Sequence, residues 1–195
     1  MAGEVSKDIT KRFLLPTDIV DAHEKGIIHF HDADYFAQHM HNCCLVNLED
    51  MLQNGTVIGE TMIEKPHSFL TACNIATQAI AQIASCQYGG QSITMSHLAP
   101  FVQISREKFR RDVRNEMTTA GLDVSDDVIN EIAELRVKRE IKQGVQTMQY
   151  QVITLMTTNG QAPFITMFMY LNEVEDGQTR DDLALIIEEM LHQRI

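Results

Sequence analysis

Apolar residues recur at helical spacing through residues 67–87, and no other stretch of the sequence restricts the architecture as strongly. The pattern lasts for about five turns, which predicts one long amphipathic helix. The pair Gly89-Gly90 follows it, and glycine is the residue that most often terminates a helix. An apolar stripe of this length needs a partner surface. Its members are Phe69, Ala72, Cys73, Ala76, Ile80 and Ile83.

Three more segments show helical patterns. The first follows Pro100, and the second begins after Ser125, whose side chain suits the N-cap position. The third begins near Thr179 and continues to the end of the sequence without a C-cap. Two short helices are also expected, one with Thr17 as its N-cap and one over residues 49–54.

Three short segments have the composition of β-strands. They are residues 27–31, residues 43–48 and residues 164–171, of which the last is rich in aromatic and branched side chains and predicts a buried strand. The three lie too far apart in the sequence to pair as hairpins. The expected fold class is therefore α/β and rich in helix, in one unit over residues 1–195 without internal repeats or low-complexity linkers.

Composition excludes several classes of protein. The formal net charge of -11 argues against a nucleic-acid groove, which needs a basic stripe. No apolar run approaches the roughly 20 residues that cross a bilayer. Four cysteines without disulfide spacing indicate a reducing compartment. We therefore expect a cytoplasmic protein that binds neither membrane nor nucleic acid.

The dipeptide Cys43-Cys44 is the first candidate for chemistry. Adjacent cysteines rarely form a disulfide with each other. Cys73 and Cys86 lie far downstream, without the Cys-x-x-Cys spacing of a zinc site. Because a strand sends successive side chains to opposite faces, one thiol of the pair can be buried while the other faces a cavity. The alternative is that both are small apolar residues of a core strand.

A histidine-rich segment precedes this dipeptide. His29, His31, His39 and His41 are candidate metal ligands, because His-x-His places both rings on one face of a strand. The alternative for His31 and Asp32 is a hydrogen-bonded strand end. We favour that alternative and predict no metal site.

Five short motifs extend, in order, across residues 2–172. They are Ala2-Gly3-Glu4-Val5-Ser6-Lys7, Gly26-Ile27-Ile28-His29-Phe30-His31-Asp32, Asn42-Cys43-Cys44-Leu45-Val46-Asn47-Leu48, Gln87-Tyr88-Gly89-Gly90 and Asn159-Gly160-Gln161-Ala162-Pro163-Phe164. With these motifs the chain resembles the catalytic subunit of the anaerobic (class III, glycyl-radical) ribonucleoside-triphosphate reductases.

The resemblance implies a ten-stranded α/β barrel, of which this chain would be an N-terminal part, and a homodimer formed through effector-binding helices at residues 64–120. A glycyl radical, installed by a radical-SAM iron–sulfur activating enzyme, would generate a thiyl radical on a loop cysteine. The thiyl radical would take hydrogen from the ribose 3′ carbon of a ribonucleoside triphosphate, and the 2′ hydroxyl would leave as water, with formate as reductant. The radical glycine, thiyl cysteine and zinc-binding cysteines would lie beyond residue 195, and an ATP-binding cone before residue 1. This chain alone is therefore expected to hold no cofactor and to be inactive.

The resemblance also assigns residues. Cys43 corresponds to the cysteine that faces the substrate and supplies hydrogen, with His29 and Asn42 near the same cavity. Cys44 would then be a core residue.

Effectors, deoxynucleoside triphosphates or ATP, would bind at the dimer interface near Glu64, His67, Gln78 and Lys108. The amide N–H groups at the start of the long helix would attract phosphate. His67 stands where the family pattern leads us to expect a lysine, and ordinary helix surface is the alternative for Gln78 and Lys108. The apolar stripes of the two helices would be covered by the second copy. The alternative to an enzyme is a non-catalytic nucleotide-binding or dimerisation module.

Overall fold

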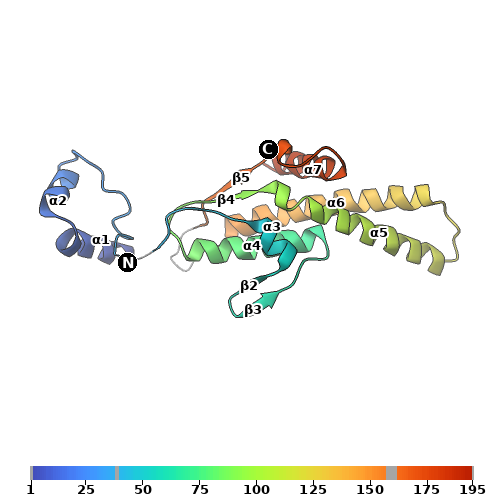
Figure 1. Cartoon of the computed structure of the whole chain (residues 1–195), viewed down its shortest axis with the longest axis horizontal. Helices are drawn as coiled ribbons and strands as arrows, with labels where there is room; N and C mark the ends of the chain where they lie inside the picture. The colour runs from blue at the N-terminus through green and yellow to red at the C-terminus, as the bar shows by residue number, and fades with distance from the viewer. Residues whose placement is uncertain (1, 38–39, 157–161, 195) are drawn as a thin grey trace.

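The computed structural model describes residues 2–37, 40–156 and 162–194, and these form a helix-rich α/β structure (Figure 1). The helices are α1 (Ala2–Ile9), α2 (Thr17–Glu24), α3 (Leu48–Asn54), α4 (Phe69–Ser85), α5 (Pro100–Thr119), α6 (Asp126–Thr154) and α7 (Gln178–His192). The strands are β1 (Cys44–Leu45), β2 (Thr56–Ile58), β3 (Thr61–Ile63), β4 (Gln91–Thr94) and β5 (Ile165–Phe168). Three short helical turns complete the chain: η1 (Thr10–Leu14), η2 (Met95–His97) and η3 (Leu171–Glu173).

The central feature is a parallel sheet in the order β1-β4-β5. Cys44 pairs with Gln91, and Gln91 pairs in turn with Ile165. Parallel neighbours need long crossover connections. Here α3, a β2–β3 hairpin and α4 connect β1 to β4, whereas α5 and α6 connect β4 to β5.

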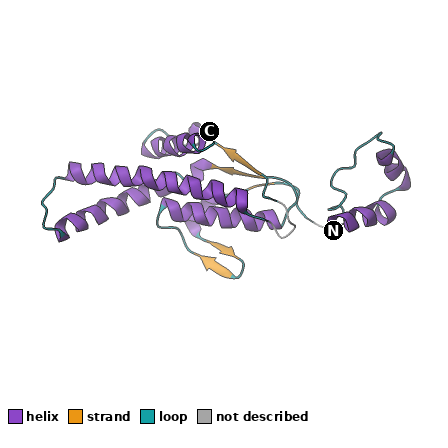
Figure 2. Cartoon of the chain, turned by 180° about the vertical axis from the view of Figure 1, so that it is seen from behind, coloured by secondary structure: helices purple, strands orange, loops and turns teal. Residues whose placement is uncertain are grey.

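Helices α4, α5 and α6 pack together and bury the core against one face of this sheet. Figure 2 shows the parallel strands and the hairpin on opposite sides of this helix layer. The stripe predicted for residues 67–87 forms α4, with Ser68 as its N-cap. The largest fully buried side chains are Phe69, Phe101, Leu48, Leu52, Ile80, Ile93, Met95, Leu98, Met148, Leu183, Ile186 and Met190.

This packing overturns the reason given for a dimer. Phe69, Ala76 and Ile80 of α4 and Phe101 of α5 are buried within the chain itself, so no second copy is needed to cover them. The predicted need for an external partner on these stripes is wrong. The homodimer itself stays a prediction.

The strand predicted at residues 27–31 is also wrong. These residues form bends and turns, and Asp32 adopts a positive φ of 53°. The backbone N–H of Phe30 donates to Nδ1 of His23 at 3.2 Å instead of to a strand. Local side-chain acceptors of this kind compete with sheet formation.

A hairpin exists where none was expected. β2 and β3 pair antiparallel, with Thr56 opposite Ile63, and Gly59 at φ 64° allows the two-residue turn between them. β4 was also missed, because Gln91-Ser92-Ile93-Thr94 is mostly polar. The β1 and β5 strands are shorter than predicted, and β5 is half-buried rather than buried.

Helix ends follow the predicted capping only in part. Ser125 caps α6 by accepting from the N–H of Val128 at 3.5 Å, as expected. The N-cap of α2 is Pro16 and not Thr17, and it makes no side-chain cap bond. Among the described residues, no helix combines the length and apolar character that crossing a membrane requires.

Candidate functional site

The two adjacent cysteines lie on opposite faces at the edge of the sheet. Cys44 is partly buried and packs against the core, whereas Cys43 is exposed. Leu45, the next residue after Cys44, is 81% exposed on the uncovered face. The alternation of side chains along a strand therefore separates the two thiols as predicted. Burial, with a smaller contribution from Cys43, raises the pKa of the Cys44 thiol and keeps it protonated.

Cys43 has one polar neighbour that the sequence motif also singled out. Its thiol donates to Oδ1 of Asn42 at 3.3 Å. Both residues are exposed, and they precede β1 where the chain runs beside the Gln87-to-Gly90 segment. The exposed thiol and its amide neighbour are thus available to a reactant on the uncovered side of the sheet.

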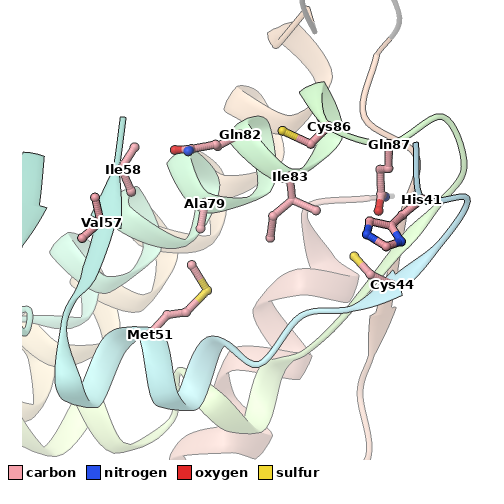
Figure 3. A pocket seen from close by; sticks show the side chains of 10 residues that line it. All are labelled: His41, Cys44, Met51, Val57, Ile58, Ala79, Gln82, Ile83, Cys86 and Gln87. Atoms are coloured by element: carbon pink, nitrogen blue, oxygen red, sulfur yellow. The ribbon is translucent and has the colours of Figure 1, made fainter. Parts of the chain in front are cut away.

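An apolar cavity of about 320 Å³ lies behind β1 (Figure 3). Cys44 lines this cavity and Cys43 does not, so the cavity that we expected beside Cys43 lies beside Cys44 instead, and Cys43 is on the exposed face. Gln82 at its wall accepts from the N–H of Gly59 at 3.1 Å, which joins the hairpin turn to α4. The lining residues are His41, Cys44, Met51, Val57, Ile58, Ala79, Gln82, Ile83, Cys86 and Gln87.

The histidines upstream form a hydrogen-bonded array. Nε2 of His29 lies 3.2 Å from Nδ1 of His31, and Nε2 of His31 lies 3.3 Å from Oδ1 of Asp32. When the Nδ1 of His31 carries no proton, it accepts a hydrogen bond from the Nε2–H of His29. His31 and Asp32 lie in contact in a turn and not at a strand end, and the hydrogen-bonded alternative for this pair stays a prediction.

No group of three potential ligands in the described ranges is arranged to hold a metal ion. His39, one of the four histidines considered for such a site, lies outside the described residues, as does the Asn159-Gly160-Gln161 part of the fifth motif. Within the described residues, no hydrogen bond joins His29 to Cys43 or Asn42.

The four predicted effector residues are all exposed, at separate places before α4, on α4 and on α5. Glu64 and His67 precede α4, and Gln78 lies nine residues after the first residue of that helix. At 1.5 Å per residue this is roughly 13 Å along the helix axis. Lys108 lies on α5. In a single chain the four residues therefore do not surround one pocket.

The amide groups at the start of α4 are not free for phosphate, contrary to our expectation. The N–H of Phe69 donates to Oγ of Ser105 at 2.8 Å, and that of Leu70 donates to Oε1 of Glu140 at 3.4 Å. Because Ser68 also accepts from the third N–H of the helix, the N-terminus is satisfied within the chain.

A buried ion-pair cluster escaped the sequence analysis. Arg106 is 2% exposed and donates to both carboxylate oxygens of Asp182, at 2.9 and 2.5 Å, which joins α5 to α7. It also donates to Glu134 on α6 at 2.6 Å. Desolvation opposes the charge on Arg106, but these hydrogen bonds prevail and raise its pKa. The one sequence signal for this cluster was Arg106 itself, an arginine on the buried side of the helix predicted after Pro100.

Comparison with known proteins agrees with the motifs. A family model described as anaerobic ribonucleoside-triphosphate reductase matches residues 1–195. The chain belongs to this family. Among the family's anaerobic ribonucleoside-triphosphate reductases, that of Haemophilus influenzae is 42% identical over 169 residues, 85% of this chain and 23% of that protein. That of Escherichia coli is 39% identical over 198 residues, 100% of this chain and 26% of that protein. That of Enterobacteria phage T4 is 39% identical over 170 residues, 86% of this chain and 27% of that protein.

The chain thus spans between 23% and 27% of the length of these family members. A solved structure, the anaerobic ribonucleotide reductase from Thermotoga maritima in complex with dATP and CTP, resembles it with a TM-score of 0.60. The match covers 98% of this chain and 31% of that one at 16% identity, so it bears on the fold alone.

Proposed function

We propose that this chain is the part of the catalytic subunit of an anaerobic ribonucleoside-triphosphate reductase that carries a reducing cysteine, Cys43. The observation that supports this most directly is the exposed Cys43 thiol on the uncovered side of a parallel sheet, hydrogen-bonded to Asn42. The sheet, with helices on one face and open strands on the other, suits a segment of a ten-stranded α/β barrel. The open face would then line the barrel interior and meet the substrate.

A thiol at this position has suitable chemistry. Its single S–H hydrogen can leave either as a proton that assists the departure of the 2′ hydroxyl as water or, because the S–H bond is weak, as a hydrogen atom. Asn42 accepts the hydrogen bond of this thiol, with Oδ1 at 3.3 Å from Sγ, which would direct the S–H bond. His29 would hydrogen-bond substrate or formate. Its ring would be oriented by the contact with His31, which in turn contacts Asp32.

The remaining parts of the reaction belong to the rest of the complete enzyme. A glycyl radical and a cysteine outside this chain would supply the thiyl radical that starts the reaction at the ribose 3′ carbon, and zinc would be bound there too. The radical-SAM activating enzyme would be a partner of that part. We place the complete enzyme in the cytoplasm.

Regulation would take place between two copies of the chain. Glu64, His67, Gln78 and Lys108 are exposed on α4, on α5 and before α4, but do not surround one pocket in a single copy. An interface between two copies can bring such dispersed residues together. We therefore propose that deoxynucleoside triphosphate or ATP effectors bind there, in contact with these side chains rather than with the satisfied N-terminus of α4.

The decisive experiment replaces each cysteine in the complete reductase. Cys43→Ala should abolish deoxyribonucleotide formation while the glycyl radical, measured by electron paramagnetic resonance, still forms. Cys44→Ala should keep turnover and lower the unfolding free energy by about 1 kcal/mol, because it removes a small, partly buried side chain. Turnover in Cys43→Ala but not in Cys44→Ala would exchange the two roles. Turnover in both would disprove the role given to this pair.

A further inference from the structure

The Tyr88-Gly89 turn, residues 87–90, lies directly against the Cys43 end of β1. The N–H of Tyr88 donates to the carbonyl of His41 at 3.3 Å, and the N–H of Gly89 donates to the carbonyl of Asn42 at 2.7 Å. The N–H of Cys44 donates back to the carbonyl of Gly90 at 3.2 Å. The backbone on both sides of Cys43 is therefore held by this turn.

The turn contains one residue more than the segment it pairs with. His41 bridges to Gln87 and Cys44 pairs with Gln91, so three steps along one segment match four along the other. Figure 3 shows His41 and Gln87 side by side at the start of this pairing. An extra residue of this kind bends a strand and redirects nearby side chains, as in a β-bulge. Here it is placed beside Asn42 and Cys43.

Gly89 leaves no room for a side chain at this point. A Cβ atom on Gly89 would lie 2.1 Å from Oδ1 of Asn42, 2.4 Å from the carbonyl oxygen of Asn42 and 2.8 Å from Sγ of Cys43. Because one of these atoms belongs to the backbone, the clash cannot be relieved by rotating a side chain. The hydrogen-bonded geometry of Asn42 and Cys43 thus requires glycine at position 89.

Tyr88 connects the same turn to the histidine segment. Its ring stacks on the ring of Tyr35, with centroids 4.7 Å apart and planes 15° from parallel. The backbone N–H of Tyr35 donates to the carbonyl of Asp32 at 2.9 Å, which ties the stacked ring to the His29–His31–Asp32 array. Burial, followed by the carboxylates of Asp34 and Asp32, raises the pKa of Tyr35, so the stacked phenol stays neutral.

We propose that Gly89 and Tyr88 are positioning residues for the proposed reductive site. Gly89 holds the Cys43 thiol on Asn42, and Tyr88, through Tyr35, holds the histidine array against the turn. The importance of this for catalysis rests on the role proposed for Cys43, whereas the positioning itself can be measured without turnover.

The first test measures the alkylation rate of Cys43 by iodoacetamide and peptide mass spectrometry, with the exposed Cys86 as an internal reference. Gly89→Ala should separate the paired segments and speed alkylation of Cys43 relative to Cys86 by about threefold or more, the effect expected from losing one net hydrogen bond. Gly3→Ala is the matched control, because its Cβ would meet only Asp34 at an ordinary 3.5 Å. An unchanged ratio in folded Gly89→Ala would overturn the role of Gly89.

The second test uses hydrogen exchange of the peptide that covers residues 29–36. Tyr88→Ala should raise exchange there, and Tyr88→Phe, which keeps the stacked ring, should not. Equal exchange in Tyr88→Ala and the native chain would refute the role of Tyr88. Tyr88 is not a residue of the buried core, so both variants should fold, and this test can be carried out even if Gly89→Ala fails to fold.

The third test returns to the complete reductase. Tyr88→Phe should retain kcat, whereas Tyr88→Ala should lower kcat at least about tenfold with little change in KM, since misplaced groups slow chemistry more than binding. Full kcat in Tyr88→Ala would contradict a catalytic consequence of positioning. If instead Cys43→Ala were active, the proposed function would fail while the alkylation and exchange results kept their meaning.

Discussion

His97 and Glu173 show how single side chains after the strands acquire unusual properties. Glu173 accepts hydrogen bonds from the hydroxyls of Thr94 and Ser96, and these lower its pKa. His97 is half-buried, and its Nδ1 is buried without a hydrogen-bond partner in the described structure. Desolvation lowers the pKa of His97 although Glu49 and Glu173 act in the opposite direction. The imidazole is therefore neutral in the folded protein near pH 7.

This neutral imidazole predicts a loss of stability in mild acid. The ordinary pKa of 6.5 applies to unfolded His97, and the folded value lies below it. Between the two values the unfolded chain binds a proton that the folded chain does not, so the unfolding free energy falls as pH decreases below about 6.5. Urea unfolding at pH 7.5, 6.5 and 5.5 should show a smaller fall in His97→Asn than in the native chain. The same substitution at exposed His192 should leave the fall unchanged, and equal slopes in all three proteins would contradict the burial argument.

Packing between helices depends on one small residue in α6. Gly144 is buried where α6 crosses α4. A Cβ atom there would lie 2.6 Å from Cε1 of Phe69 and 3.0 Å from Sγ of Cys73. Burial raises the pKa of the Cys73 thiol, with a further contribution from Glu140, so this contact stays uncharged. Glycine at this point therefore permits the close approach of α4 and α6.

We expect Gly144→Ala to lower the unfolding free energy by about 1 kcal/mol. Overpacking costs about 1–3 kcal/mol, and the gain in helix propensity of about 1 kcal/mol offsets only part of it. Phe69 is 1% exposed and cannot move aside. Chemical denaturation followed by circular dichroism measures the change. Gly3→Ala in α1 should not lower stability, since its new methyl group meets only Asp34, at an ordinary contact distance of 3.5 Å. A Gly144→Ala protein as stable as the native one would show that the interface can relax.

The molecule as a whole has one covered and one open sheet face. Helices pack on the face with Cys44, Ile93 and Ile165, whereas Leu45 and Phe168 on the other face are 81% and 46% exposed. Under the proposed function, this open face would line the interior of a barrel completed by other strands. The core stripes of α4 and α5 are satisfied within the chain, so a dimer would form through polar outer faces of these helices.

At this scale we predict a nucleotide-dependent dimer. Light scattering should show dimerisation at micromolar concentration, and calorimetry should show deoxynucleoside triphosphate binding to that dimer. Lys108→Ala should weaken binding by about 1 kcal/mol or more, the size of a charge-assisted contact. Lys142→Ala, at an exposed position on α6, is the control and should leave binding unchanged. A verified dimer without nucleotide binding would rule out the effector site but not the family assignment.

The sequence alone determined the features that depend on near neighbours. The stripe in residues 67–87 and the cap at Ser125 predicted α4 and the start of α6, because periodicity and capping act within a few turns. Strand alternation separated Cys43 from Cys44 before any packing was known. The ordered motifs were sufficient to indicate the family, since they need no geometry.

Tertiary structure decided whatever depends on distant partners. The polar strand β4 exists because β1 and β5 pair with it, and the N–H groups of Phe69 and Leu70 are satisfied by Ser105 and Glu140, which lie 36 and 70 residues away. The requirement for glycine at position 89 likewise arises from the backbone of Asn42, a neighbour only in the fold. Hydrogen bonds and steric contacts between remote segments leave no local pattern in the sequence, because neither residue of such a pair indicates its partner.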